Sequence, residues 1–154
     1  MDTLFTILHV VGAVFIVGPM AVLPQSGLRA IRAANSGAVT TFAKSTFIFT
    51  IASIVVALLG FALVGMADPK YHLSVGTPWV LSAVIAYVLA LVLSLVLVVP
   101  GLRGAARAIG ANSGGATAGG AVRVKAPGYA KVAAGSGLVS LLLVVVVVLM
   151  VWKP

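Results

Sequence analysis

The chain of 154 residues contains no cysteine and no glutamate, and its carboxylate side chains are limited to Asp2 and Asp68. Without cysteine there can be no disulfide, no thiolate metal site and no c-type haem attachment. Without a pair of carboxylates near each other in the sequence, general acid–base catalysis by such a pair has no residues to use. Serines are frequent, but they lie in apolar segments with no charged base beside them. We therefore predict that the protein is not an enzyme.

Charge is also scarce, and it is mostly of one sign. Ten Lys and Arg stand against two acidic residues, which gives a formal net charge of +8. Eight of the ten cations fall in two stretches, 25–45 and 100–131. Neither stretch matches a recognised nucleic-acid-binding module. We therefore expect no nucleic acid as a partner, and we expect attraction to anionic lipids instead.

What the chain does have is long apolar runs. Hydrophobic residues make up 62% of it, charged residues 8%, and the mean hydropathy is +1.24. A soluble domain needs more polar surface than this, whereas about 20 apolar residues cross a bilayer core of about 30 Å. Apolar runs of that length lie at 4–23, 46–66, 78–99 and 132–152. We predict an all-α protein with a single domain, 1–154, made of four transmembrane helices.

The positions of the cations predict an orientation in the membrane. Short cytoplasmic loops are enriched in Lys and Arg. The loops 24–45 and 100–131 hold most of the cations, whereas the other side of the membrane has Lys70 and Lys153. We therefore expect both termini outside the cell, with the chain in the inner (plasma) membrane and the two basic loops in the cytoplasm.

The two basic loops are similar in sequence. Residues 27–32 resemble 101–107, and the string Ala-Asn-Ser-Gly occurs at 34–37 and again at 111–114. Either the chain is a parallel repeat of two helical hairpins, or two unrelated loops follow the same charge rule. The glycine-rich stretch 110–120 looks flexible in isolation, so we expect another chain to hold it.

Apolar residues recur at helical spacing in both loops, which predicts short helices at the membrane interface. The cations of these helices and of the following segment would face lipid headgroups or a partner protein. The residues concerned are Arg29, Arg32, Arg103, Arg107, Arg123 and Lys125.

Small and hydroxyl-bearing residues mark the faces on which the helices should pack, because helix association in lipid depends on close approach. These residues recur at steps of three and four at Thr46, Thr50, Ser53, Ala57 and Gly60, at Ser82, Ala86, Ala90 and Ser94, and at Ala133, Ser136, Gly137 and Ser140. The rest of the fourth run, 141–151, is unbroken aliphatic sequence. It either faces lipid or docks on a larger membrane subunit. Pro19 should bend the first helix.

His9 is the histidine that lies within an apolar run, and His72 lies in the loop on the same side of the membrane. A membrane histidine opposite small residues such as Gly12 and Ala13 can be an axial haem ligand or a copper ligand. The alternative is a histidine bonded to a neighbouring carbonyl or hydroxyl. We favour the second interpretation, because a single intramembrane histidine supplies too few ligands for most metal sites.

A short motif opens the first run: residues 8–14 read LHVVGAV, and Gly18 follows about a turn later. This motif resembles the start of an uncharacterised actinobacterial family of four-helix integral membrane proteins. More distantly, it is similar to the copper-resistance D type of membrane protein. The other intramembrane histidines and the tryptophan–glycine signature of that type are missing here, which argues against metal or haem binding.

The resemblance implies an accessory subunit of the actinobacterial respiratory cytochrome bcc–cytochrome c oxidase supercomplex. Together with the lack of reactive residues, it predicts a non-catalytic accessory or assembly subunit that has no cofactor and contacts larger integral membrane subunits. The alternative is a haem- or copper-binding membrane protein that uses His9.

Overall fold

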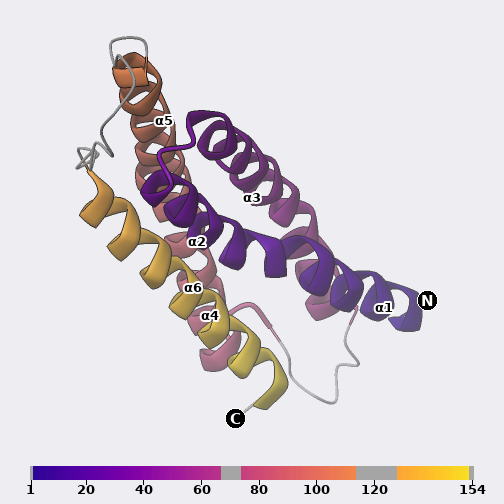
Figure 1. Cartoon of the computed structure of the whole chain (residues 1–154). Helices are drawn as coiled ribbons and strands as arrows, with labels where there is room; N and C mark the ends of the chain where they lie inside the picture. The colour runs from indigo at the N-terminus through magenta and orange to yellow at the C-terminus, as the bar shows by residue number, and fades with distance from the viewer. Residues whose placement is uncertain (1, 67–73, 114–127, 153–154) are drawn as a thin grey trace.

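The computed structural model describes residues 2–66, 74–113 and 128–152, and within these ranges the chain is helical apart from short turns. Figure 1 shows the helices running alongside one another as a bundle. Four helices have the length and apolar composition to cross a membrane: Thr3–Arg32, Ser36–Gly65, Pro78–Asn112 and Tyr129–Trp152. The protein is an integral membrane protein with four spans, as the apolar runs predicted.

The first and third spans each consist of three consecutive segments, the middle one a π-helical turn (η). The first span comprises α1 (Asp2–Gly12), η1 (Ala13–Val17) and α2 (Gly18–Arg32). The third comprises α4 (Pro78–Leu93), η3 (Ser94–Val98) and α5 (Val99–Ser113). The other two spans are single helices, α3 (Ser36–Gly65) and α6 (Tyr129–Trp152). Both composite spans run away from the end that holds the termini and both single helices return to it, which is the arrangement a parallel repeat requires (Figure 1).

Prolines account for the π-helical turns. Pro19 and Pro100 lack a backbone N–H, and in an α-helix the proline ring clashes with the carbonyl four residues earlier. One residue before Pro19, the N–H of Gly18 bonds the carbonyl of Ala13, five residues earlier, and Val99 does the same before Pro100. The wider turn relieves the clash. The helix therefore continues through each proline, and the bend expected at Pro19 takes the form of η1.

The basic segments are more helical than the sequence predicted. In the predicted loop 24–45 only the turn at 33–35 is not helical, and the predicted loop 100–131 begins as helix. The helices continue because their inward faces bury apolar side chains, namely Leu28, Ile31, Leu102 and Ile109. The predicted interfacial helices are therefore extensions of the membrane spans, and the spans are longer than their apolar runs.

The turn between α2 and α3 is tight. Ala34 has a left-handed φ of 51°, and the N–H of Asn35 bonds the carbonyl of Ala30, which closes α2 with a Schellman motif. The side chain of Asn35 accepts a hydrogen bond from the N–H of Ala38 (2.9 Å) and caps α3. The similar string at 111–113 does not turn, because α5 continues through it to Ser113.

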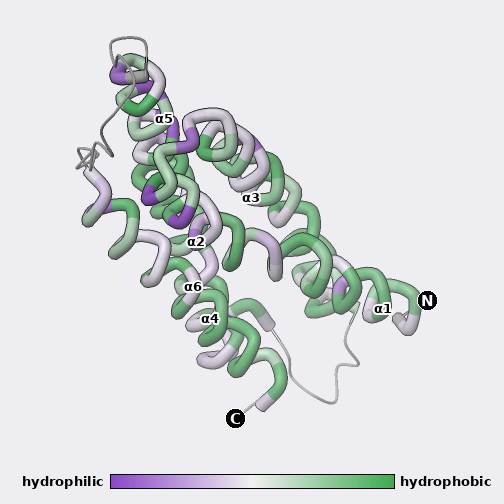
Figure 2. The backbone as a smooth tube through the Cα atoms, viewed as in Figure 1, coloured by the Kyte–Doolittle hydropathy of each residue, from purple (hydrophilic) through white to green (hydrophobic). Residues whose placement is uncertain are grey.

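The spans pack as a four-sided bundle, in which α2 lies against α3 and α6, α5 lies against α3, and α4 lies against α6. We call the end formed by α2, α5 and the first turns of α3 and α6 the basic half. The opposite end, formed by α1, α4 and the last turns of α3 and α6, is the terminal half. Hydrophilic residues gather at the tips of α2 and α5 (Figure 2). The buried apolar core lies mainly in the basic half and includes Met20, Val39, Val98, Leu102, Ile109 and Val132.

Most of the predicted small-residue positions pack inside the bundle. The buried ones are Thr46, Thr50, Ser53, Ala86, Ala90, Ser94 and Ser136. The prediction was wrong for Ser82 and Gly137, which are exposed. No heavy atom lies within 4 Å of a Cβ placed on Gly137, and Ser82 bonds the carbonyl of Pro78 in its own helix. These two residues face away from the neighbouring spans.

Candidate functional site

An apolar cavity of about 570 Å³ lies in the terminal half, between α1, α3, α4 and α6. It exists because α1 packs against α3 but diverges from α4 and α6, whereas α2 contacts both α3 and α6 (Figure 1). Its walls include Val10 and Val14 of α1 and η1, and Val144, Val147 and Val148 of α6. Four of these five side chains are more than half exposed. The cavity is therefore a groove open at the surface of the bundle.

His9 lies on the wall of this cavity, held against α3. Its Nδ1 donates a hydrogen bond to the carbonyl of Val56 (2.9 Å), since a carbonyl oxygen can only accept. The imidazole lies over Gly60, where a Cβ would come within 2.9 Å of its Cε1 atom. His9 thus has the carbonyl partner that the favoured interpretation expected, while its role as a ligand stays a separate prediction. With Nδ1 carrying the hydrogen in a neutral ring, Nε2 is left as a hydrogen-bond acceptor.

Two pairs of hydroxyl groups join α3 to the third span. The hydroxyl of Thr50 donates to the carbonyl of Thr46 (2.7 Å) and lies 2.9 Å from that of Ser94. The hydroxyl of Ser53 donates to the carbonyl of Thr50 (2.7 Å) and lies 2.8 Å from that of Tyr87. Because each hydroxyl has one hydrogen, Ser94 and Tyr87 are the donors within their pairs. The sequence did not lead us to predict a role for Tyr87, although a tyrosine in the middle of an apolar run is a signal of a hydrogen-bond partner.

Ser140 ties α6 to the first span at the boundary of the two halves. Its hydroxyl lies 2.8 Å from the carbonyl of Ala21 in α2 and 3.0 Å from that of Ser136 in its own helix. Together with His9, Ser53 and Tyr87, Ser140 supplies the polar atoms on the cavity wall. All four lie among aliphatic side chains, so the cavity suits an apolar body with at most one or two polar groups.

Within the described residues, the cavity does not bring together a set of His, Cys, Asp or Glu side chains that could bind a metal ion. Among the described residues, no three His, Cys, Asp or Glu side chains come close enough to hold one ion. His72, which the sequence placed on the same side of the membrane as His9, lies outside the described residues. Of the His, Cys, Asp and Glu side chains in the described part of the chain, His9 is the one that lines the cavity.

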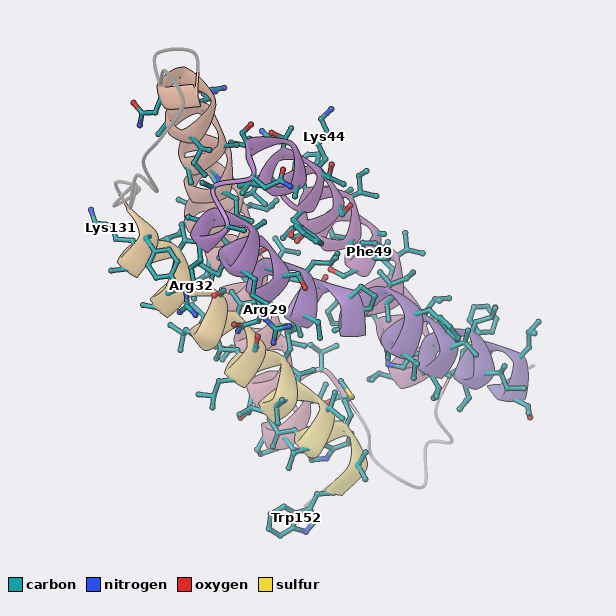
Figure 3. The ribbon with its side chains drawn as sticks, in the orientation of Figure 1. Arg29, Arg32, Lys44, Phe49, Lys131 and Trp152 are labelled. Carbon is teal, nitrogen blue, oxygen red and sulfur yellow. The ribbon has the colours of Figure 1, made fainter. Side chains whose placement is uncertain are left out.

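At the basic end, Arg32 is engaged within the bundle. Its Nε donates to the hydroxyl of Tyr129 (2.6 Å), and its guanidinium lies 5.4 Å from the centre of the tyrosine ring, which joins α2 to the start of α6. Arg29 is exposed on the same helix. Figure 3 shows Arg32, Lys44 and Lys131 toward the end of the bundle opposite Trp152. Arg32 therefore has a structural contact as well as an accessible position.

The remaining predicted contact residues divide into two groups. Arg103 and Arg107 lie on α5 and, with Lys44 of α3, line a second cleft of about 480 Å³. Arg123 and Lys125 lie outside the described residues, as does most of the glycine-rich stretch predicted to need a partner. The structure thus brings three cations together from two helices.

Comparison with known proteins agrees with this architecture. A family model described as a predicted integral membrane protein (DUF2269) matches residues 3–154, nearly the whole chain. No curated protein matches, and no solved structure matches.

Proposed function

We propose that this chain, which belongs to the DUF2269 family of predicted integral membrane proteins, is a non-catalytic accessory subunit of a larger membrane complex. A transmembrane helix of the larger subunit fills the groove between α1 and α6. The subunit braces that helix and performs no chemistry of its own.

The observation that carries this proposal is the one-sided packing of α1, which lies against α3, whereas α2 in the same span lies against both α3 and α6. Among the 18 most apolar consecutive residues of the first span, 6% are buried inside the bundle. The corresponding shares for the second, third and fourth spans are 17%, 28% and 22%. In α1, the exposed side chains include Leu4, Ile7, Leu8, Val10 and Val11. A span that touches its own bundle on one side has the other sides available for a partner.

Small residues on the cavity wall favour a helix over a lipid chain as the occupant. Ala13, Gly18 and Ala57 all line the cavity and are partly exposed. Residues of this size let helix backbones approach closely, which is the main source of helix association in lipid. Gly18 has no heavy atom within 4 Å of its Cβ position, so its backbone is open to such an approach.

The respiratory assignment rests on the resemblance of the motif at 8–14 to actinobacterial membrane proteins. On that basis, the partners are integral subunits of the cytochrome bcc–cytochrome c oxidase supercomplex. The chain lies in the plasma membrane with both termini outside, and its basic half faces the cytoplasm. The excess of Lys and Arg in the basic half supports this orientation.

Affinity purification in a mild detergent, followed by mass spectrometry, tests the proposal with a matched pair of variants. Val147→Trp places a large ring in the groove, whereas Val145→Trp places it on another face of α6, outside the cavity; the two valines are 51% and 40% exposed. Val147→Trp should lose the bcc–oxidase subunits and Val145→Trp should keep them. Absence of those subunits with the unmodified chain, or equal recovery with both variants, would refute the proposal.

A second candidate, a haem- or copper-binding protein, is favoured by the orientation of His9. A metal-ligating histidine commonly donates its other ring N–H to a carbonyl, and His9 donates Nδ1–H to Val56. An absorption spectrum and metal analysis of the purified chain test this. A Soret band or bound copper that His9→Ala abolishes would establish the second candidate and displace the first.

A further inference from the structure

The second cleft lies between the first turns of α3 and residues 103–110 of α5. Thr40 and Lys44 of α3 face Arg103 and Arg107 of α5 across it. The helices close at the tip, where a Cβ placed on Gly110 would lie 4.0 Å from the Cβ of Ser36. The cleft is therefore a defined concavity with cations on both walls.

The chain has few groups of its own to neutralise these charges. Ten Lys and Arg share two acidic side chains, and Asp2 lies at the start of α1, in the terminal half. Within the described residues, Lys44 and Arg107 have no hydrogen bond and no ion pair. Arg103 lies with its guanidinium 5.3 Å from the centre of the Phe47 ring, a contact that leaves its N–H groups available. No carboxylate side chain is among the described residues that line the cleft, so its cations are available to an anion from outside the chain.

The first turn of α3 adds neutral donors to the same place. The first N–H groups of a helix have no partner within it, and Gly37, the second residue of α3, lines the cleft. Such N–H groups favour a phosphate or another anion. They supplement the three cations, which carry most of the attraction.

The cleft continues into an apolar surface. Along α3, the side chains of Phe47 and Ile48, one turn beyond Lys44, and of Ile51, two turns beyond it, are exposed. On the neighbouring span, Val96 in η3 is 71% exposed just before the helix that bears Arg103. Since α3 packs against both η3 and α5, cations and exposed hydrocarbon follow each other along one face. This order matches the headgroup and chains of a membrane lipid.

We propose that this cleft binds the phosphate of an anionic phospholipid, with the acyl chains lying along Phe47, Ile51 and Val96. Arg103 and Arg107 donate to the phosphate oxygens, and Lys44 contributes a third charge. A free phosphate ion would satisfy the cations but leave the apolar face unused, whereas a lipid occupies both. The site lies in the basic half, away from the groove, and it is independent of the accessory role.

Native mass spectrometry of the purified full chain, titrated with phosphatidylglycerol, measures the binding. Phosphatidylcholine and inorganic phosphate are the comparison ligands. The test variant is Lys44→Gln with Arg107→Gln, which spares the contact of Arg103 with Phe47. The control is Arg29→Gln with Lys131→Gln, which removes two exposed cations that do not line the cleft.

Phosphatidylglycerol should bind the unmodified chain more tightly than either comparison ligand does. The cleft variant should lose about 25-fold in affinity, roughly fivefold for each cation, and the control less than about threefold. Lys44→Arg with Arg107→Lys, which keeps the charges, should retain most of the binding. If the cleft variant and the control lost equal affinity, the attraction would come from the overall positive charge and not from the cleft. If inorganic phosphate bound as tightly as the lipid, the cleft would bind any phosphate without using the apolar surface. Either result would overturn the proposal.

Discussion

In the basic half each span has close neighbours on two sides, and side chains such as Val39, Leu102 and Val132 are almost completely buried between them. In the terminal half, α1 has α3 on one side and an open groove on the other. Both halves belong to the same four spans, and the closely packed half is the less apolar one, since α2 and α5 carry arginines whereas α1 and α4 are almost entirely apolar. The difference shows that in a bundle of this kind close packing depends on where backbones approach, and hydrophobicity alone does not produce it.

The largest expected effect on the free energy of unfolding comes from adding a side chain at a glycine that packs closely in the basic half. A Cβ on Gly101 would overlap Val132, a β-branched and buried side chain with little freedom to move. Gly101→Leu should lower the free energy of unfolding by about 3 kcal/mol. Equilibrium unfolding in mixed micelles measures the change. Gly104→Leu on the same helix, where nothing lies within 4 Å of the Cβ position, is the control and should cost little.

A matched pair of glycines compares the two halves directly. A Cβ on Gly27 would lie 2.9 Å from Leu102, and a Cβ on Gly60 would lie 2.9 Å from His9. Both Gly→Ala changes gain the same helix propensity. Leu102 is fully buried, whereas His9 belongs to a helix packed on one side, which can shift outward. Gly27→Ala should therefore be less stable than Gly60→Ala by about 1 kcal/mol, and equal stabilities would mean that α1 is held as firmly as α2.

Removing backbone strain from the turn between α2 and α3 should raise the free energy of unfolding and leave the groove unchanged. Ala34 adopts a left-handed φ, which costs a residue with a Cβ about 1 kcal/mol. Ala34→Gly should recover about that amount, seen as a higher midpoint of thermal unfolding. Its neighbour Ala33 has a φ of −81°, so Ala33→Gly relieves no strain and should not stabilise the protein. A destabilised Ala34→Gly variant would argue against the Schellman turn.

The smallest expected effect lies where the two halves meet. Tyr87→Phe removes the hydroxyl that donates to Ser53, and hydrogen bonds between membrane helices are worth about 0.6 kcal/mol on average. The variant should lose about that much stability in the same unfolding assay. Ser82→Ala removes a bond within a single helix and serves as the control. A loss of several kcal/mol would mean that these hydroxyls, and not close packing, hold α3 to α4.

Local sequence patterns predicted much of the fold. Hydropathy located the four spans, and the recurrence of Thr46, Thr50 and Ser53 located the buried face of α3. The bond of His9 also followed from simple chemistry, because a neutral imidazole in hydrocarbon needs a partner. These features depend on residues within a few turns of one another, or on a requirement that any neighbour can meet.

Features that depend on distant segments were not predictable. The short helix predicted around Arg29 and Arg32 is continuous with the first span, since Leu28 and Ile31 are buried against other spans, and this continuity was not predicted. The groove arises from the divergence of α1 and α6, and neither helix carries a local signal for that angle. The cleft brings Lys44 and Arg107 together from helices that are far apart in the sequence, so it required the packing to be known.

Distances between spin labels test the contrast between the halves most directly, and the absence of native cysteine makes the labelling specific. One double variant places labels on α1 and α6 (Leu8→Cys with Val145→Cys), and the other on α2 and α6 (Arg29→Cys with Lys131→Cys). For the purified chain in lipid nanodiscs, the distances in the terminal half should be broadly distributed and those in the basic half narrow. In native membranes, where we propose that a partner helix fills the groove, the distances of the terminal pair should become narrowly distributed as well. A terminal pair that is already narrow in the purified chain and unchanged in membranes would contradict the account.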